Sequence, residues 1–288
     1  MQASILTDLL LPLALGIIMF GLGLSLTLDD FKRVARYPLA VSFGLLLQIV
    51  ILPFAAFAIA VALKLSPHHA IGLMLLAASP GGATANIYSH LAKGDVALNI
   101  TLTAVNSILC LISLPIVLNL SLDYFLGAGQ YVPPPLRKII EVGAIILVPV
   151  IIGMFVRSRS AAFAQKAEKP IKLFSVLILG ILILAAIWLE RRTLLDSIIA
   201  VGLACILFNL VSMASGYFLP RALNLPDRQA TAIAMEIGVH NTALAIYIAL
   251  NVLNNSAASI VPGVYTLAMY ASATAFAIYS ARRMRQGA

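Results

Sequence analysis

One stretch of nine residues organises the rest of the chain: Ala234-Met235-Glu236-Ile237-Gly238-Val239-His240-Asn241-Thr242. It lies in the middle of an apolar segment that runs from about 230 to 253. A carboxylate at that depth in a membrane helix costs at least about 2.5–3.5 kcal/mol, so Glu236 needs a cation, a partner or a proton. Gly238 and the polar pair His240-Asn241 follow at once, where a helix can unwind and offer its carbonyl oxygens to an ion.

The composition around this stretch is that of a polytopic membrane protein. Hydrophobic residues make up 61% of the 288 residues, charged residues only 10%, and the mean hydropathy is +1.02. These values exclude an ordinary soluble domain. We therefore expect a single transmembrane domain, with the lipid bilayer as its surroundings.

Apolar runs separated by polar gaps predict nine transmembrane helices. Their approximate bounds are 4–27, 38–63, 69–92, 95–120, 136–157, 170–189, 194–219, 229–253 and 257–281. The first carries no basic residue before Lys32, so it is read as a retained span and not as a signal peptide. If the N-terminus lies outside, 14 of the 19 lysines and arginines fall on the cytoplasmic side and 5 outside. This bias predicts an external N-terminus and a cytoplasmic C-terminus in a plasma (inner) membrane.

The remaining features argue against other classes of protein. The lysines and arginines that give the net charge of +8 lie in the gaps between the spans, as residues that set membrane topology do, so no nucleic-acid partner is expected. The longest polar loops, 123–135 and 158–169, are too short for a catalytic domain, and no catalytic or nucleotide-binding motif occurs. We expect neither an enzyme nor a cofactor. Cys110 and Cys205 lie inside apolar segments and are interpreted as small buried hydrophobes, without a disulfide or a metal.

Two predicted spans are interrupted. The third contains Pro80-Gly81-Gly82, which removes a backbone donor and adds flexibility, so its helix should break there. The eighth contains Gly238 at similar depth. These spans are five apart and so cross the membrane in opposite directions. Paired breaks of this kind are expected in an inverted-repeat transporter, with its binding site where the breaks meet.

Neutral oxygens accompany the carboxylate. Asn86, Asn99 and Thr103 lie in the third and fourth spans, and the last two share a helix face at i, i+4 spacing. Together with Glu236 they form the hard oxygen set that a small monovalent cation prefers. Ordinary hydrogen bonding between helices remains the other interpretation, above all for Thr103.

Three further amides and one imidazole lie within the spans. Gln48 should face protein, because an unpaired amide in lipid is costly. Asn106 and Asn209 are interpreted as interhelical hydrogen-bonding residues. His240 lies one helical turn from Glu236 if the helix persists that far, which keeps proton coupling through this pair open.

The sequence resembles the bile acid:sodium symporter family, including its bacterial members, over nearly its whole length. Four segments carry the resemblance, and the last looks like the family's Glu-x-Gly-x-Gln-Asn signature: Leu15-Gly16-Ile17-Ile18-Met19-Phe20-Gly21-Leu22-Gly23-Leu24, Ser79-Pro80-Gly81-Gly82, Lys93-Gly94-Asp95-Val96-Ala97-Leu98 and Glu236-Ile237-Gly238-Val239-His240-Asn241. The resemblance implies an all-α fold of two inverted repeats with two broken, crossing helices. It also implies a panel domain (spans 4–27, 136–157 and 170–189) and a core domain made of the other six spans.

By resemblance, two sodium ions bind near the crossing. The first-sodium positions correspond to Asn86, Asn99, Thr103, Glu236 and Asn241, and the second-sodium positions to Gln48, Glu236, Ile237, Val239 and His240, with Ile237 and Val239 contributing main-chain carbonyls. The substrate cavity corresponds to Thr84, Asn86, Asn241 and Tyr270. The chain departs from the family pattern in having Ala85 where a serine ligand is common and His240 where a glutamine stands, which leaves the sodium stoichiometry open.

These observations together predict a sodium-coupled secondary active symporter. It would import an organic anion, either bile-acid-like or a smaller carboxylate such as pantoate, by alternating access. Two alternatives stay open: a proton-coupled carrier that uses Glu236 and His240, and a membrane receptor that binds an organic anion without moving it. The sequence predicts sodium as the only metal ion and leaves the oligomeric state undetermined.

Overall fold

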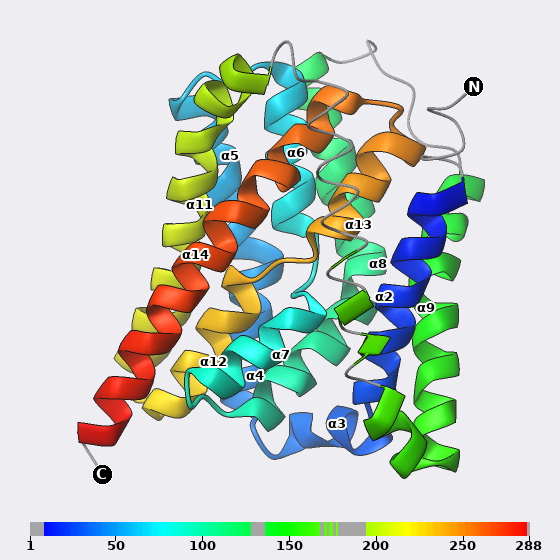
Figure 1. The fold of residues 1–288 in the computed structure, drawn as a ribbon. Helices are drawn as coiled ribbons and strands as arrows, with labels where there is room; N and C mark the ends of the chain where they lie inside the picture. The colour runs from blue at the N-terminus through cyan, green and yellow to red at the C-terminus, as the bar shows by residue number, and fades with distance from the viewer. Residues whose placement is uncertain are drawn as a thin grey trace.

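The structure, a computed structural model, describes residues 9–127, 136–167 and 194–286, together with positions 170, 171, 173, 174 and 177. The named elements of these residues are all helices, and Figure 1 shows them as an elongated bundle. In chain order they are α2 (Leu11–Ser25), α3 (Leu28–Lys32), η2 (Arg33–Ala35), α4 (Pro38–Leu46), η3 (Leu47–Ile51), α5 (Leu52–Ala62), α6 (Pro67–Ala78), α7 (Ala83–Leu91), α8 (Val96–Leu126), α9 (Leu136–Arg159), α11 (Leu194–Ala222), α12 (Asp227–Gly238), α13 (Thr242–Tyr247), η4 (Ile248–Val252) and α14 (Ser256–Gln286).

Five helices of the described residues are long and apolar enough to cross a membrane. They are Pro38–Ala62, Val96–Leu126, Ile140–Arg159, Val201–Ala222 and Ser256–Arg285. A sixth is added if α2 and the segment Leu28–Ala35, which bend by 72° against each other, count as one span. α6 and the segment Thr242–Val252 are apolar but shorter. The predicted all-α membrane class is thus confirmed, while the predicted total of nine spans stays a prediction.

Several predicted bounds differ from the helices observed. α8 continues to Leu126, six residues past the predicted end at 120, because no proline or glycine lies between 120 and Gly127, which ends the helix with φ 90°. α14 extends to Gln286, and residues 161–167 of the predicted loop 158–169 are helical. The predicted span 170–189 lies largely outside the described residues.

α2 and α9 pack closely side by side (Figure 1). Glycines permit the approach, since a Cβ added at Gly23 would overlap the backbone of Val150, and one added at Gly153 would overlap the backbone of Phe20. Arg157 of α9 donates from its guanidinium to the carbonyl of Leu24 at 2.8 Å, which satisfies a free acceptor at the end of α2. The two helices therefore form one tightly joined unit.

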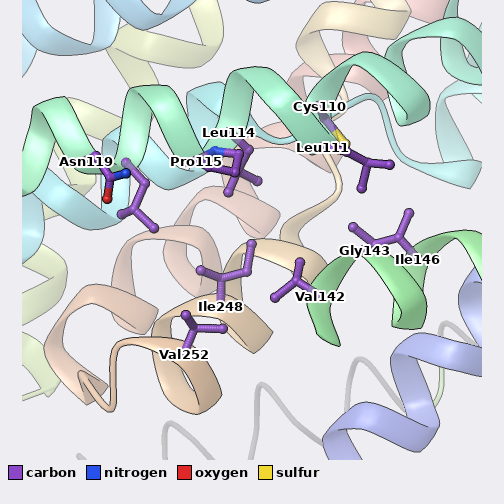
Figure 2. A pocket seen from close by; sticks show the side chains of 11 residues that line it. Cys110, Leu111, Leu114, Pro115, Asn119, Val142, Gly143, Ile146, Ile248 and Val252 are labelled. Atoms are coloured by element: carbon purple, nitrogen blue, oxygen red, sulfur yellow. The ribbon is translucent and has the colours of Figure 1, made fainter. Parts of the chain in front are cut away.

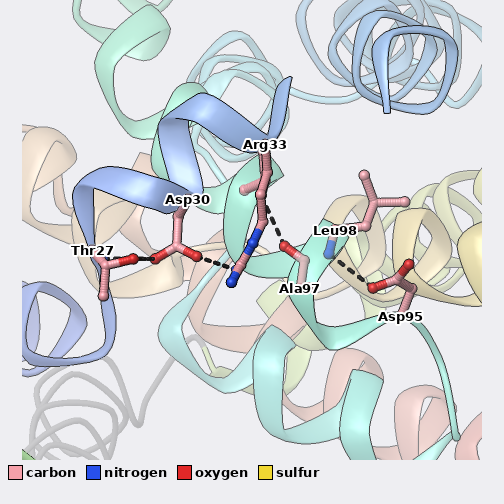
Figure 3. A network of polar contacts seen from close by, with 7 residues as sticks. Thr27, Asp30, Arg33, Asp95, Ala97 and Leu98 are labelled. Carbon is pink, nitrogen blue, oxygen red and sulfur yellow. Dashed lines mark hydrogen bonds and ion pairs between the residues drawn. The ribbon is translucent and has the colours of Figure 1, made fainter. Parts of the chain in front are cut away.

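A short corner joins this unit to the rest of the bundle. Thr27 and Asp30 form a capping box at the start of α3, and Asp30 is also paired with Arg33 (Figure 3). Only 3% of Asp30 is exposed, so water hardly competes with Thr27 and Arg33 for hydrogen bonds to the Asp30 carboxylate. The corner fixes how the chain turns from α2 into α4, next to the first turn of α8.

Buried apolar side chains form two large clusters. One joins α4, α5 and α6 to α8, α11, α12 and α14. The other joins α2 and α9 to α6, α8, α13 and η4. α6 and α8 contribute to both clusters, so the broken segments lie between them.

We expect Gly23→Ala to lower the melting temperature of the purified protein. Its Cβ meets backbone atoms, which cannot rotate away, and overpacking of this kind costs about 1–3 kcal/mol. The matched control is Gly202→Ala, where an added Cβ meets nothing within 4 Å and alanine favours the helix by up to about 1 kcal/mol. Equal melting temperatures for the two variants would contradict the close packing of α2 on α9.

Candidate cation-binding site at two helix breaks

Both interrupted segments break in the structure. α6 ends at Ala78 and α7 begins at Ala83, so Pro80, Gly81 and Gly82 lie in the gap between them. α12 ends at Gly238 and α13 begins at Thr242. The two gaps meet in the middle of the bundle (Figure 1).

The two gaps satisfy each other's backbone groups. Gly81 and His240 form an isolated antiparallel β-bridge. The backbone N–H of Gly82 donates to the carbonyl of Val239 at 2.7 Å, and the N–H of Asn241 donates to the carbonyl of Pro80 at 2.8 Å. Non-helical backbone at membrane depth is tolerated only where it is buried in protein or lines a cavity, and here each gap supplies part of the other's hydrogen bonding.

Glu236 lies beside this bridge, near the C-terminal end of α12, with 1% of its surface exposed. One carboxylate oxygen, Oε2, accepts a hydrogen bond from the Thr103 hydroxyl at 2.5 Å and from the Asn99 amide at 3.4 Å. The other oxygen, Oε1, has no hydrogen-bond partner among the described residues. A Cβ at position 81 would overlap the carboxylate, so any residue other than glycine there would displace it.

Other buried oxygens also lack a donor. Asn99 orients its amide nitrogen toward the carbonyl of Ala232 at 2.9 Å, which leaves its Oδ1 without a partner among the described residues. The same holds for Asn86 Oδ1 on α7 and Gln48 Oε1 on η3. Together with Glu236 Oε1, four buried side-chain oxygens of the predicted sodium-binding residues thus accept no hydrogen bond within the described part of the chain. A cation can satisfy such atoms, and a hard monovalent ion prefers oxygen.

Gln48 and His240 meet at one carbonyl. The Gln48 amide donates to the carbonyls of Ala77 and Ser79, both at 3.0 Å. His240 Nδ1 lies 3.2 Å from the same Ser79 oxygen, and the imidazole stacks on Phe208 with ring centroids 5.5 Å apart. A carbonyl only accepts, so Nδ1 carries the proton and Nε2 presents a lone pair. Nε2 has no partner among the described residues.

The helix does not persist as far as His240, so the condition for a one-turn relation between His240 and Glu236 is not met. α12 ends at Gly238, so His240 does not follow Glu236 by one turn of the same helix. Instead His240 contacts Ser79 and Phe208, and no hydrogen bond joins it to Glu236 within the described part of the chain. The break itself turns the imidazole toward different neighbours.

The other predicted site residues are near the breaks but already have partners. Val239 uses its carbonyl in the bridge, and the Asn241 side chain caps α13 by accepting from the Leu244 N–H at 3.1 Å. Ile237 is fully buried. Thr84 is half-buried in the first turn of α7, and Tyr270 stacks on Tyr88 with centroids 5.9 Å apart.

One supporting residue was missed by the sequence reasoning. The Tyr265 hydroxyl donates to the carbonyl of Gly238 at 2.9 Å, and the Asn209 amide donates to the same oxygen at 3.0 Å. Asn209 also contacts Tyr265 and Ser272, which confirms its interhelical role. A tyrosine in the middle of a predicted span is a usable signal, because its hydroxyl needs a buried partner.

A separate small apolar pocket of about 30 Å³ lies between α8, α9 and η4 (Figure 2). α8 contributes Cys110, Leu114 and Asn119, and α9 faces them with Val142 and Ile146. None of the predicted cavity residues Thr84, Asn86, Asn241 and Tyr270 lines it. The pocket is therefore separate from the site at the two breaks.

A membrane-embedded bundle with a buried carboxylate at two crossing breaks is typical of a secondary transporter. Comparison with known proteins gives the family: a sequence profile of the Sodium Bile acid symporter family matches residues 12–197. The chain belongs to this family of sodium-dependent transporters, as its motifs predict, and it is an integral membrane protein.

Curated relatives are similar over most of this chain. An uncharacterized sodium-dependent transporter of Bacillus subtilis, YocS, is 32% identical over 236 residues, which are 82% of this chain and 72% of that protein. A probable sodium/metabolite cotransporter of rice chloroplasts, BASS2, is 29% identical over 95% of this chain and 64% of its own length. The rabbit ileal sodium/bile acid cotransporter is 27% identical, covering 84% of this chain and 69% of its own. The chain therefore spans roughly two thirds to three quarters of these relatives.

We expect Thr103→Val to destabilise the protein more than Thr101→Val. Both threonines are fully buried on α8, but Thr101 bonds only the Ala97 carbonyl of its own helix, whereas Thr103 donates to Glu236. A hydrogen bond to a charged group contributes about 1.5–3 kcal/mol, against about 0.5–1.5 kcal/mol for a neutral one. Thermal unfolding in detergent measures the difference, and an equal loss in both variants would contradict the Thr103–Glu236 contact.

Proposed function

We propose that this protein is a sodium-coupled symporter that imports an organic anion by alternating access. The observation that carries the proposal is the buried Glu236 carboxylate, whose Oε1 has no donor among the described residues. No basic side chain in the described ranges forms an ion pair with it, because the ion pairs found there involve Asp29, Asp30 and Asp227. A bound cation supplies the missing charge.

Sodium accounts for the surrounding oxygens better than a proton does. A proton on Glu236 converts one oxygen into a donor and leaves Asn99 Oδ1, Asn86 Oδ1 and Gln48 Oε1 without one. An ion with several oxygen ligands can satisfy more of them at once. Among the described residues, no three His, Cys, Asp or Glu side chains lie together so that they could hold a metal ion. The oxygens around Glu236 belong to amides and hydroxyls, which carry no charge, and such ligands suit a singly charged ion.

The arrangement of the helices supports the finer architecture. The broken pairs α6/α7 and α12/α13 meet through an antiparallel bridge, as two inverted repeats would place them. The tight α2–α9 unit matches the proposed panel, which would be completed by 170–189, and the other helices match the core. With the N-terminus outside and the C-terminus in the cytoplasm of an inner membrane, the chain would have nine spans.

The proposed substrate is an organic anion, either bile-acid-like or a smaller carboxylate. Two relatives are named for such cargo, a bile acid in one and a metabolite in the other. α7 begins at Ala83 beside the crossing, so the positive end of its dipole favours an anionic group there. Thr84, Asn86, Asn241 and Tyr270 are the proposed lining residues.

Coupling follows if sodium binds one conformation better than the other, since a ligand shifts an equilibrium only by its differential affinity. The proposed ligands come from α7, α8 and α12, with Gln48 on η3, so a bound ion ties together segments on both sides of the breaks. Rocking of the core against the panel would expose the anion to one side of the membrane at a time.

The first test is thermal stability against sodium, with potassium and choline as ionic-strength controls. Specific binding stabilises the folded protein by RT ln(1 + [Na]/Kd), about 2.7 kcal/mol at one hundred times Kd. We expect a sodium-specific rise in the melting temperature that is lost in Glu236→Gln. Gly81→Ala should also lose it, because its Cβ overlaps the carboxylate, while Gly82→Ala should retain most of it, since the nearest atom to that Cβ is the His240 carbonyl oxygen at 3.1 Å. Absence of any sodium-specific shift at saturating salt would refute sodium coupling.

The second test separates the alternatives by transport in proteoliposomes. A sodium gradient should drive uptake of a suitable organic anion, and His240→Gln should keep that uptake, whereas a proton-driven carrier using His240 would lose it. Saturable binding in detergent without counterflow in vesicles would identify a receptor instead.

A further inference from the structure

The end of the bundle where α11 and α14 finish carries a group of arginines that the transport proposal does not use. Here the C-terminal ends of α11 and α14 lie beside the start of α12 (Figure 1). We define the arginine cluster by the five residues that these three segments contribute: Arg221, Arg228, Arg282, Arg283 and Arg285. Asp227 is the one carboxylate that these three segments contribute, so with it the cluster has a formal charge of +5 − 1 = +4. Asp95 of the neighbouring loop also lies beside Arg228, whose carbonyl accepts from the Asp95 N–H at 2.9 Å.

Asp227 holds two of these arginines in fixed positions. Arg221 Nε lies 2.7 Å from Asp227 Oδ1, and Arg283 Nε lies 3.6 Å from Asp227 Oδ2. A guanidinium has five N–H donors in a rigid fork, so these contacts leave donors for a further oxyanion. The two side chains are partly exposed, at 28% and 42%, which keeps those donors accessible.

The remaining three arginines are exposed, and none forms an ion pair with a residue that the structure describes. Two basic residues elsewhere in the bundle are used internally: Arg33 pairs with Asp30, and Arg157 bonds the Leu24 carbonyl. The cluster therefore keeps an excess of positive charge that its own neighbours do not neutralise.

A row of aromatic rings runs beneath the cluster. We define the aromatic row as Phe218, Tyr217, Phe276 and Tyr279, in which successive ring centroids are 5.3, 5.1 and 6.3 Å apart. Arg221 lies over Tyr217 at 4.9 Å, and Arg283 donates to the Tyr279 hydroxyl at 3.3 Å. Phe218 and Tyr279, the two ends of the row, are 60% and 51% exposed on helices long and apolar enough to cross a membrane, whereas Tyr217 between them is buried. Exposed aromatic rings near the ends of such helices are typical of the membrane interface.

We propose that the arginine cluster and the aromatic row form a binding site for an anionic phospholipid. The phosphate would accept from the guanidinium forks of Arg221 and Arg283, and the glycerol and upper acyl chain would lie against Phe218 and Tyr279, the exposed ends of the aromatic row. The general excess of basic residues on one side of a membrane explains how many arginines stand here. It does not explain why two of them are oriented by a shared carboxylate and by the rings of Tyr217 and Tyr279, next to the exposed rings of Phe218 and Tyr279.

The site rests on these contacts alone and not on sodium coupling. The proposed lipid site joins α11, α12 and α14. α12 carries Glu236, and Asn209 of α11 and Tyr265 of α14 both donate hydrogen bonds to the Gly238 carbonyl at the break. A bound lipid would therefore brace the three helices on which the break depends.

The test is lipid retention by the purified full-length protein, measured by native mass spectrometry after equilibration with equimolar phosphatidylglycerol and phosphatidylcholine. Wild type should retain phosphatidylglycerol preferentially. Arg282→Gln and Arg285→Gln remove exposed charges without breaking an ion pair, and each should weaken that preference about fivefold. The matched control is Arg159→Gln, an exposed arginine at the end of α9 that lies over Phe155, which should leave the preference unchanged.

Two further measurements distinguish a specific phosphate-binding site from a general attraction of the lipid to positive charge. The double variant Arg221→Lys and Arg283→Lys keeps the net charge but loses the forks, so it should lose most of the preference. Full retention in the lysine variant, or an equal loss in Arg159→Gln, would overturn the proposal. Inorganic phosphate that stabilises the protein as strongly as phosphatidylglycerol would also overturn it, by identifying a site for a free anion.

Discussion

The Glu236 carboxylate is a buried charge for which the surrounding protein provides hydrogen bonds but no counter-charge among the residues described. Thr103 and Asn99 hold one of its oxygens, and Gly81 leaves just enough room for the carboxylate to stand against the other break. A charge in such a place is costly unless a cation joins it. A bound cation, as in the proposed sodium coupling, would supply the counter-charge that the described residues do not.

Breaking two helices at membrane depth is the structural condition for this site. An unbroken helix would satisfy its own carbonyls and could not offer them to a ligand. Gly82 donates a hydrogen bond to Val239, and Asn241 donates one to Pro80. These bonds lower the free-energy cost of both breaks, because each gap satisfies backbone groups of the other. The Gly238 carbonyl has no partner within α12, because the helix ends there, and it accepts hydrogen bonds from Tyr265 and Asn209 instead. The same contacts that stabilise the breaks also couple them, because neither gap can move without changing the hydrogen bonds of the other.

The remainder of the bundle divides into parts of different character. α2 and α9 are joined through glycine contacts and the Arg157 cap, whereas α9 leaves an apolar pocket where it faces α8 and η4. In the proposed transport cycle, this joined pair of helices would move as one body against the rest of the bundle. At the end of the bundle where α11 and α14 finish, charged and aromatic side chains take over from apolar packing, which fits a surface that meets lipid headgroups.

The sequence by itself determined the membrane class, the family and the positions of both breaks. These follow from local chemistry: apolar composition, the donor lost at Pro80 and the flexibility of Gly81, Gly82 and Gly238. It also placed Glu236 correctly as a buried carboxylate, since no partner lies near it along the chain. The length of α8 was less predictable, because a polar residue such as Asp123 is compatible with a helix and only Gly127 ends it. Only the tertiary structure decided that Thr103 and not Thr101 meets the carboxylate, and that His240 turns to Ser79 and Phe208. It also decided that Tyr265 supports the break. Each of these contacts joins residues far apart in sequence, and their geometry is fixed by packing between helices, which no local pattern encodes.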